Sequence, residues 1–357
     1  MILIAGVSIA VFIAALLISK KQKSQGDIIL TAWMMIIAVQ MLFYHAYITD
    51  IIFRYPIFLA WERPLPLLHG VLLYWYVATM TDQRPSSKFL LYLHFIPTLF
   101  FYLVLIPFFL RPVEEKIWVY RNEGAGYEIL DAIRMGAIIL SGTIYIIWSA
   151  ILLSRHKRSI LNRFSYEEKI NLQWLRILTW GLGSVWLLIF ISDEVLSVGV
   201  TIFVFMIGFF GIRQSRIFKT TENNLEVPEK EKYAKSGLTK ETAETLYAGL
   251  MRLMNEEAVY QKNDLSIYDL ATRLNVHPNY LSQVINELER KNFYDFVNQY
   301  RLNHFIKLIS DTRNRYLTFL ALAYESGFNS KSSFNRYFKK ATGKTPSEYF
   351  SSEGLVN

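Results

Sequence analysis

The chain has 357 residues, which is enough for two or three domains. Hydrophobic residues make up 52% of it and aromatic residues 15%, both high for a soluble protein, while the net charge is +8. These values indicate a membrane segment together with an anionic partner, and the absence of cysteine excludes a disulfide framework or a cysteine-based zinc site.

The basic residues are spread unevenly along the chain. Residues 1–219 carry 20 Lys/Arg and 13 Asp/Glu, whereas residues 220–357 carry 18 and 17. Within the second part, residues 300–357 hold 9 basic and 4 acidic residues. The cation excess of the polar part therefore lies near the C-terminus, where an anionic partner would bind.

Residues 1–212 contain apolar stretches of about 20 residues, the length that crosses a bilayer as a helix. They predict a seven-helix transmembrane bundle, whose spans are Ile2–Ser19, Ile28–Ile48, Leu65–Thr81, Phe89–Leu110, Ile129–Leu153, Ile170–Ser192 and Val195–Ile212. The first stretch has no preceding basic residue and no small-residue cleavage site after it, so we interpret it as a retained helix, not a signal peptide.

The loops between these stretches predict the orientation of the bundle. Thirteen basic residues fall after odd-numbered spans or after the last span, and five fall after even-numbered spans. Because basic residues accumulate on the cytoplasmic side, we expect a multi-pass protein of the inner (cytoplasmic) membrane, with its N-terminus outside and its C-terminal domain in the cytoplasm.

Several ionisable residues lie within or beside the predicted spans. Such residues are candidates for a ligand-sensing or transport site, but interfacial and structural roles compete, and Asp131 and Arg134 could pair at i,i+3. The set comprises His45, Glu62, Arg63, His69, His94, Asp131, Arg134, Arg176, Asp193 and Glu194. No HExxH, P-loop, GxSxG or paired metal-ligand motif occurs, so we expect no catalytic residue, no cofactor, no metal and no enzymatic activity.

Residues 213–238 are polar, mixed in charge and without apolar periodicity, which predicts a linker. Residues 239–258 predict an amphipathic helix with a stripe formed by Leu246, Leu250, Leu253 and Met254. The stripe could pack on the following domain or pair with a second copy of the chain.

Two helix pairs follow. In the first, Ser266 and Asp269 have the spacing of a capping box, and Pro278 suits the first position of the second helix. In the second, Thr318 can cap a short apolar helix, and Gly327 can take the positive φ of a sharp turn. The helix that follows, about 330–340, is aromatic on one face and cationic on the other, which is typical of a helix-turn-helix whose second helix enters the major groove.

The segment resembles the C-terminal DNA-binding domain of AraC/XylS-type transcription regulators. The resemblance rests on the Gly327-Phe328 pair, the sequence FNRYFKK, and the run from Gly343 through Pro346 to Tyr349. It implies an all-α DNA-binding domain over 259–357, with two helix-turn-helix units at about 266–287 and 318–340 joined by a helix at 293–309. The preceding apolar half is similar to the membrane-bound members of that family.

The resemblance also implies roles for individual residues. The base-reading positions would be Lys331, Ser332, Ser333 and Arg336 in the second unit and Asn279, Ser282 and Gln283 in the first, and the phosphate contacts would come from Arg301, Lys339, Lys340 and Lys344.

Three features depart from the family pattern. Arg290 occupies a position where the family has glycine, and Phe305 one where it has a small residue. No basic residue lies between Pro278 and Asn286, so we expect the second unit to dominate DNA binding.

We therefore expect a membrane-tethered, one-component transcription regulator that binds specific double-stranded DNA and whose membrane domain senses a signal. Its expected partners are DNA, the lipid bilayer, RNA polymerase, a second copy of the chain and an unknown signal ligand. Two alternatives compete: a membrane receptor or transporter whose C-terminal domain binds protein, and an integral-membrane enzyme, for which no catalytic constellation is present.

Overall fold

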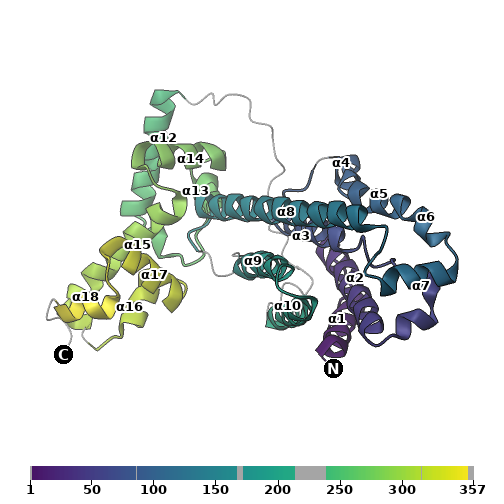
Figure 1. The fold of residues 1–357 in the computed structure, drawn as a ribbon. Helices are drawn as coiled ribbons and strands as arrows, with labels where there is room; N and C mark the ends of the chain where they lie inside the picture. The colour runs from purple at the N-terminus through teal and green to yellow at the C-terminus, as the bar shows by residue number, and fades with distance from the viewer. Residues whose placement is uncertain (1, 86, 167–171, 214–238, 315, 353–357) are drawn as a thin grey trace. The chain divides into compact units, whose positions relative to one another are not determined.

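The computed structural model describes residues 2–85, 87–166, 172–213, 239–314 and 316–352 (Figure 1). These residues form helices and no strand, as the sequence predicts, apart from one isolated bridge between Phe164 and Ser266. The chain divides into two compact units: residues 1–154 with 172–227, and residues 155–171 with 228–357. The predicted linker, 213–238, lies outside the described residues except for Arg213, the last residue of α10.

The described part of the first unit is built around six longer helices. They are α1 (Ile2–Ile18), α2 (Gln25–Ile48), α3 (Pro66–Met80), α8 (Glu128–Arg163, of which residues 155–163 belong to the second unit), α9 (Gln173–Leu188) and α10 (Asp193–Arg213). Most of their buried apolar side chains form one core, which includes Trp33, Leu73 and Leu175. Ser24 and Asp27 form a capping box at the start of α2, and Lys20 pairs with the buried Asp27 at 2.7 Å, which fixes the turn between α1 and α2.

Shorter helices fill the rest of this unit. They are the 3-10 helices η1 (Ile51–Arg54) and η2 (Pro56–Phe58) and the helices α4 (Lys88–Leu93), α5 (Ile96–Val104), α6 (Ile106–Phe109) and α7 (Val113–Arg121). The predicted fourth span, Phe89–Leu110, is therefore not one helix. Pro97 and Pro107 fall in the first turns of α5 and α6, where proline lacks the amide proton that would continue the preceding helix.

Three of the described helices are long and apolar enough to cross a membrane: Gln25–Ile48, Glu128–Arg163 and Asp193–Phe210. Helices α1, α3 and α9, which match three further predicted spans, have 17, 15 and 16 residues. The described part of the chain thus supports three of the seven predicted spans by length.

The large exposed apolar side chains are concentrated in the first unit. Ile129 is 78% exposed, Leu187 68% and Phe190 69%, whereas Leu288, Tyr316 and Tyr324 are the large apolar residues that the described part of the second unit exposes. Large exposed apolar surfaces are typical of regions that contact lipid or another protein.

The second unit contains two small cores. The first is formed by α12 (Lys240–Asn255), α13 (Ile267–Arg273), α14 (Pro278–Val284) and the start of α15 (Phe293–Ser310); the 3-10 helix η3 (Val259–Gln261) and the π-helical segment η4 (Ile285–Glu289) complete it. The second is formed by Tyr294 and the later part of α15 with α16 (Phe319–Glu325), α17 (Lys331–Thr342) and α18 (Pro346–Ser352). The 3-10 helix η5 (Thr312–Asn314) lies between α15 and α16 along the chain. Helix α15 belongs to both cores, with Phe296 and Val297 in the first and Leu302 and Phe305 in the second.

The stripe on α12 is buried in the first of these cores. Leu250 and Met254 are fully buried, and Leu246 and Leu253 nearly so. Of the two readings of the stripe, the structure supports packing on the following domain. A second copy of the chain would not find these side chains exposed.

Candidate nucleic-acid interface

The turn between α16 and α17 is fixed by Thr318 and Gly327. The Thr318 hydroxyl accepts a hydrogen bond from the Ala321 amide at 3.2 Å, which confirms its predicted role as the N-cap of α16. Gly327 has a φ of +97°, and a Cβ atom there would lie 2.4 Å from the Tyr260 carbonyl oxygen. Only glycine therefore fits this position, both by conformation and by space.

Helix α17 has two distinct faces. Phe334, Tyr337 and Phe338 are buried, and the ring of Phe334 lies 4.6 Å from that of Phe305, centroid to centroid. The exposed face carries Lys331, Ser332, Arg336, Lys339 and Lys340. A buried aromatic face thus fixes the helix while a cationic face points to solvent, as the sequence predicts.

Ser333 does not belong to the exposed face. It is 2% exposed, so its hydroxyl cannot reach the edge of a base. Lys331, Ser332 and Arg336 are the predicted base-reading residues of α17 that solvent reaches.

The exposed cations of this region also have protein partners. Lys340 pairs with Asp295 at 2.6 Å, although its side chain remains 61% exposed. Arg336 donates to the Tyr294 hydroxyl at 3.5 Å, a contact long enough to yield to a better acceptor. Lys339 and Lys344 are exposed as well, so a phosphate could approach each of these four cations.

The first helix pair presents amides and a hydroxyl in place of cations. Asn279 is exposed, and Ser282 and Gln283 are half-buried. Gln283 donates to Glu287 at 2.8 Å, which holds the amide beside a carboxylate. These side chains can exchange hydrogen bonds with base edges, but they supply no charge for phosphates.

Capping residues and a proline position α13 and α14 as the sequence predicts. Ser266 and Asp269 form the expected capping box of α13, and Pro278 begins α14. His277, which sequence reasoning did not single out, caps α14 by accepting a hydrogen bond from the Asn279 amide at 3.2 Å. Arg290 replaces the family's glycine by adopting the left-handed conformation itself, with a φ of 54°.

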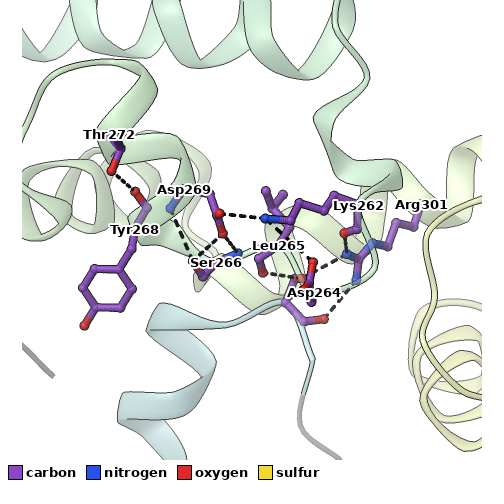
Figure 2. Close-up of polar contacts among 9 residues, drawn as sticks. Lys262, Asp264, Leu265, Ser266, Tyr268, Asp269, Thr272 and Arg301 are labelled. Atoms are coloured by element: carbon purple, nitrogen blue, oxygen red, sulfur yellow. Dashed lines mark hydrogen bonds and ion pairs between the residues drawn. The ribbon is translucent and has the colours of Figure 1, made fainter. Parts of the chain in front are cut away.

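Arg301 is not placed to bind a phosphate. Its side chain is 1% exposed, and its guanidinium group donates to the carbonyl oxygens of Tyr260 at 2.8 Å and Ser165 at 3.0 Å. It also donates to the carbonyl oxygen of Lys262 at 2.7 Å, as Figure 2 shows. An arginine buried by carbonyl groups fixes the backbone around it and cannot meet DNA. The assignment of Arg301 as a phosphate contact is therefore wrong.

The described residues contain no cluster of three or more His, Asp or Glu side chains that could hold a metal ion. The site is thus a surface of hydrogen-bonding and cationic side chains on two short helices.

Comparison with known proteins agrees with this geometry in the C-terminal part. Residues 270–352 match a family model described as a helix-turn-helix domain, of the AraC type. No curated protein and no solved structure matches the chain. The matched residues include α14, α15, α16 and α17, so the C-terminal part of the chain carries a helix-turn-helix domain, the DNA-binding domain of a family of transcription regulators.

Proposed function

We propose that the chain is a membrane-tethered, one-component transcription regulator. Its C-terminal domain would bind specific DNA through two helix-turn-helix units, α13–α14 and α16–α17. The observation that carries this proposal is the exposed cationic face of α17 over a buried aromatic face, within the residues that match the helix-turn-helix family. Lys331 and Arg336 would read guanine, and Asn279 and Gln283 would suit adenine.

The first unit would be embedded in the membrane as a seven-span bundle with the C-terminal domain in the cytoplasm. Three described helices are long and apolar enough to span a bilayer, and the exposed apolar side chains gather in this unit. Helices of 15 to 17 residues would span by locally thinning the bilayer. The excess of basic residues in loops after odd-numbered spans supports the orientation.

A cavity in the first unit supports a sensing role for it. The cavity has a volume of about 440 Å³, within the range of small-molecule sites. Its apolar lining includes Trp186 and Phe203, and its polar lining includes Gln40, Glu62, His69 and Arg134. One carboxylate oxygen of Glu62, Oε2, is buried without a hydrogen-bond partner among the described residues.

The charged residues beside this cavity form a network. Arg63 pairs with Asp131 at 2.6 Å, and Arg134 pairs with the same carboxylate at 3.1 Å, which is the i,i+3 contact that the sequence predicts. Glu62 Oε1 accepts a hydrogen bond from the Tyr120 hydroxyl at 3.0 Å and lies 3.8 Å from Arg63 Nε, so Oε2 is the atom of this carboxylate without a partner among the described residues. A signal molecule that donates a hydrogen bond would satisfy it.

RNA polymerase and a second copy of the chain are further proposed partners, as family resemblance suggests. The competing function is a membrane receptor or transporter whose C-terminal domain binds protein. The cations on α17 favour DNA, because phosphate contacts supply most non-specific affinity.

The test is selection of random-sequence duplexes by the full-length protein in lipid nanodiscs. We expect enrichment of a specific site whose affinity falls steeply with salt, because cations on α17 displace counterions. Reversing the charge with Lys331→Glu and Arg336→Glu together should abolish binding, whereas Lys307→Glu, on the exposed side of α15, serves as the matched control. Enrichment of no duplex at low salt would favour the receptor or transporter.

A further inference from the structure

The guanidinium group of Arg301 has a partner far away in the sequence. Besides the Tyr260 and Lys262 carbonyls, it donates to the carbonyl oxygen and to the hydroxyl oxygen of Ser165, each at 3.0 Å. Asn298, also fully buried on α15, donates to the same Ser165 carbonyl at 3.1 Å. Two buried polar side chains of the second unit are thus satisfied by a residue that follows α8.

Ser165 is itself built into the second unit. It is fully buried, and its amide and hydroxyl donate to the Leu265 carbonyl at 3.1 and 2.6 Å. Phe164 forms an antiparallel bridge with Ser266, and its ring lies 6.4 Å from that of Tyr268. Leu161 packs on the second core, beside residues of α15 to α18. Residues 155–166, which we name the docked segment, therefore contact both halves of the domain.

The same segment lies opposite the first recognition helix. A cavity of about 320 Å³ has Pro278, Asn279 and Ser282 on one side. Arg155, Arg158, Ser159, Asn162 and Arg163 of the docked segment line the other side. Two of the three residues of α14 proposed to read bases thus face the end of α8.

This arrangement would crowd α14 in the major groove. The groove is about 12 Å wide and admits one α-helix, which is itself about 10–12 Å across with its side chains. Helix α8 extends to Arg163. Its last turns would therefore occupy space beside Asn279 that the DNA backbone would need if α14 lay in the groove. Base contact by α14 requires this segment to leave.

We propose that the docked segment is an autoinhibitory cover of the first helix-turn-helix unit, held by Ser165 against Arg301 and Asn298. In the docked state α17 is open to DNA, whereas the end of α8 stands beside Asn279 and Ser282 of α14. Release of the segment would give α14 room to enter the groove, and the domain would then read a longer site. The inference rests on the proposed function, since it presumes that α14 binds DNA. The three arginines of the segment also allow a second outcome, in which they hold phosphates and strengthen binding.

A disulfide trap separates these outcomes. The chain has no cysteine, so Phe164→Cys with Ser266→Cys introduces a single pair. Residues facing each other across an antiparallel bridge have Cα atoms about 4.5–5.5 Å apart, within the range that a disulfide bridges. Oxidation would lock the segment in the docked state, and a reductant would release the same protein.

With full-length protein in nanodiscs and a duplex obtained by selection, we expect the disulfide to form without DNA. The oxidised form should bind at least about tenfold more weakly than the reduced form, which is the loss of a base-contacting pair. Nuclease footprints should be shorter in the oxidised form. The single variants Phe164→Cys and Ser266→Cys control for each change alone, and the parent chain controls for the reductant.

A second variant tests the docking of residues 155–166 without a crosslink. Phe164→Ala with Ser165→Gly removes the ring contact and the Ser165 hydroxyl from the docked segment and leaves residues 239–357 unchanged. Because docking is weakened, the nuclease footprint of this variant should be longer than that of the parent chain. Failure of the disulfide to form, or an oxidised affinity equal to or above the reduced one, would overturn the proposal. Loss of binding in Arg155→Ala with Arg158→Ala and Arg163→Ala would also overturn it in favour of a phosphate clamp. If the disulfide forms but neither state binds any duplex, the DNA-binding function fails instead.

Discussion

Gly327 and Gly343 both have a positive φ, but only one of them lies close to neighbouring backbone. Gly327 has a φ of +97° and Gly343 of +78°. A Cβ atom at Gly327 would lie 2.4 Å from the Tyr260 carbonyl oxygen and 2.8 Å from the Gln261 Cα, whereas at Gly343 nothing lies within 4 Å. Only Gly327 is therefore constrained by a neighbouring backbone.

Alanine at these two positions should have unequal costs. We expect Gly343→Ala to destabilise the second unit by about 1–2 kcal/mol, the cost of a left-handed alanine. Gly327→Ala should cost the same amount for its conformation and about 1–3 kcal/mol more, because its Cβ atom would overlap the neighbouring backbone. Hydrogen exchange of the α16 and α17 amides in the full-length protein measures both, and equal protection in the two variants would contradict the close approach.

Arg336 and Lys339 differ in their proposed contacts, although both are exposed on α17. Arg336→Ala should weaken binding to the selected duplex by about 1–3 kcal/mol and relax the preference at one base pair. Lys339→Ala should weaken binding to all duplexes alike and lower the salt dependence by about one counterion. Titrations against matched and mutated sites distinguish the two, and identical profiles for the variants would exclude base reading by Arg336.

At the scale of elements, Asp269 links the start of α13 to the turn before it. Its carboxylate accepts from the Ser266 amide and hydroxyl and pairs with Lys262 at 2.7 Å (Figure 2). Burial alone would raise its pKa, but the hydrogen bonds from Lys262 and Ser266 outweigh burial and hold the pKa below its usual value of 3.8. A carboxyl with a lowered pKa stabilises the folded state above that value and loses this contribution as the pH falls through its folded pKa.

Removing the cap should therefore have a pH signature. Ser266→Ala should cost about 1 kcal/mol at neutral pH, because the Asp269 amide loses its acceptor. Asp269→Asn should lower the free energy of unfolding at neutral pH. The difference in this free energy between variant and parent should shrink below about pH 4, where the parent carboxyl becomes protonated. Exchange of the α13 amides, compared between variant and parent at each pH, gives the measurement; a constant difference from pH 6 to pH 3 would contradict the role of the charge.

Elements with local signals were predictable, and contacts between distant residues were not. The capping box at Ser266, proline at position 278 and the turn at Gly327 each depend on neighbours in sequence, and each has the predicted geometry. The fourth apolar stretch was predicted as one span from composition, which does not register that Pro97 and Pro107 each end a helix. Arg301 was misassigned because its partners, Ser165 and Tyr260, lie far from it along the chain. Ser333 was misassigned because its side of α17 is decided by packing.

At the scale of the whole molecule, α8 is the element with a part in both proposed activities. Its 36 residues would extend over about 54 Å at 1.5 Å per residue. Arg134, Met135 and Ile138 line the cavity of the first unit, and residues 155–163 of the same helix belong to the docked segment. A ligand that binds the cavity more tightly in one position of α8 would shift the docking equilibrium by that difference in affinity.

The proposed seven-span topology would place the two ends of the first unit in opposite compartments, and the absence of cysteine makes this measurable. Gln22 and Glu114 are exposed, the first between α1 and α2 and the second in the first turn of α7, and replacing either leaves the basic residues of the loops unchanged. A membrane-impermeant maleimide applied to intact cells should label Glu114→Cys and should label Gln22→Cys only after lysis. The parent chain gives the background, and a cysteine in place of Ser332 on α17 should behave like Gln22→Cys. Labelling of the Ser332→Cys variant in intact cells would place the helix-turn-helix domain outside, where it meets no chromosome, and a seven-span bundle with its C-terminus in the cytoplasm would then be excluded.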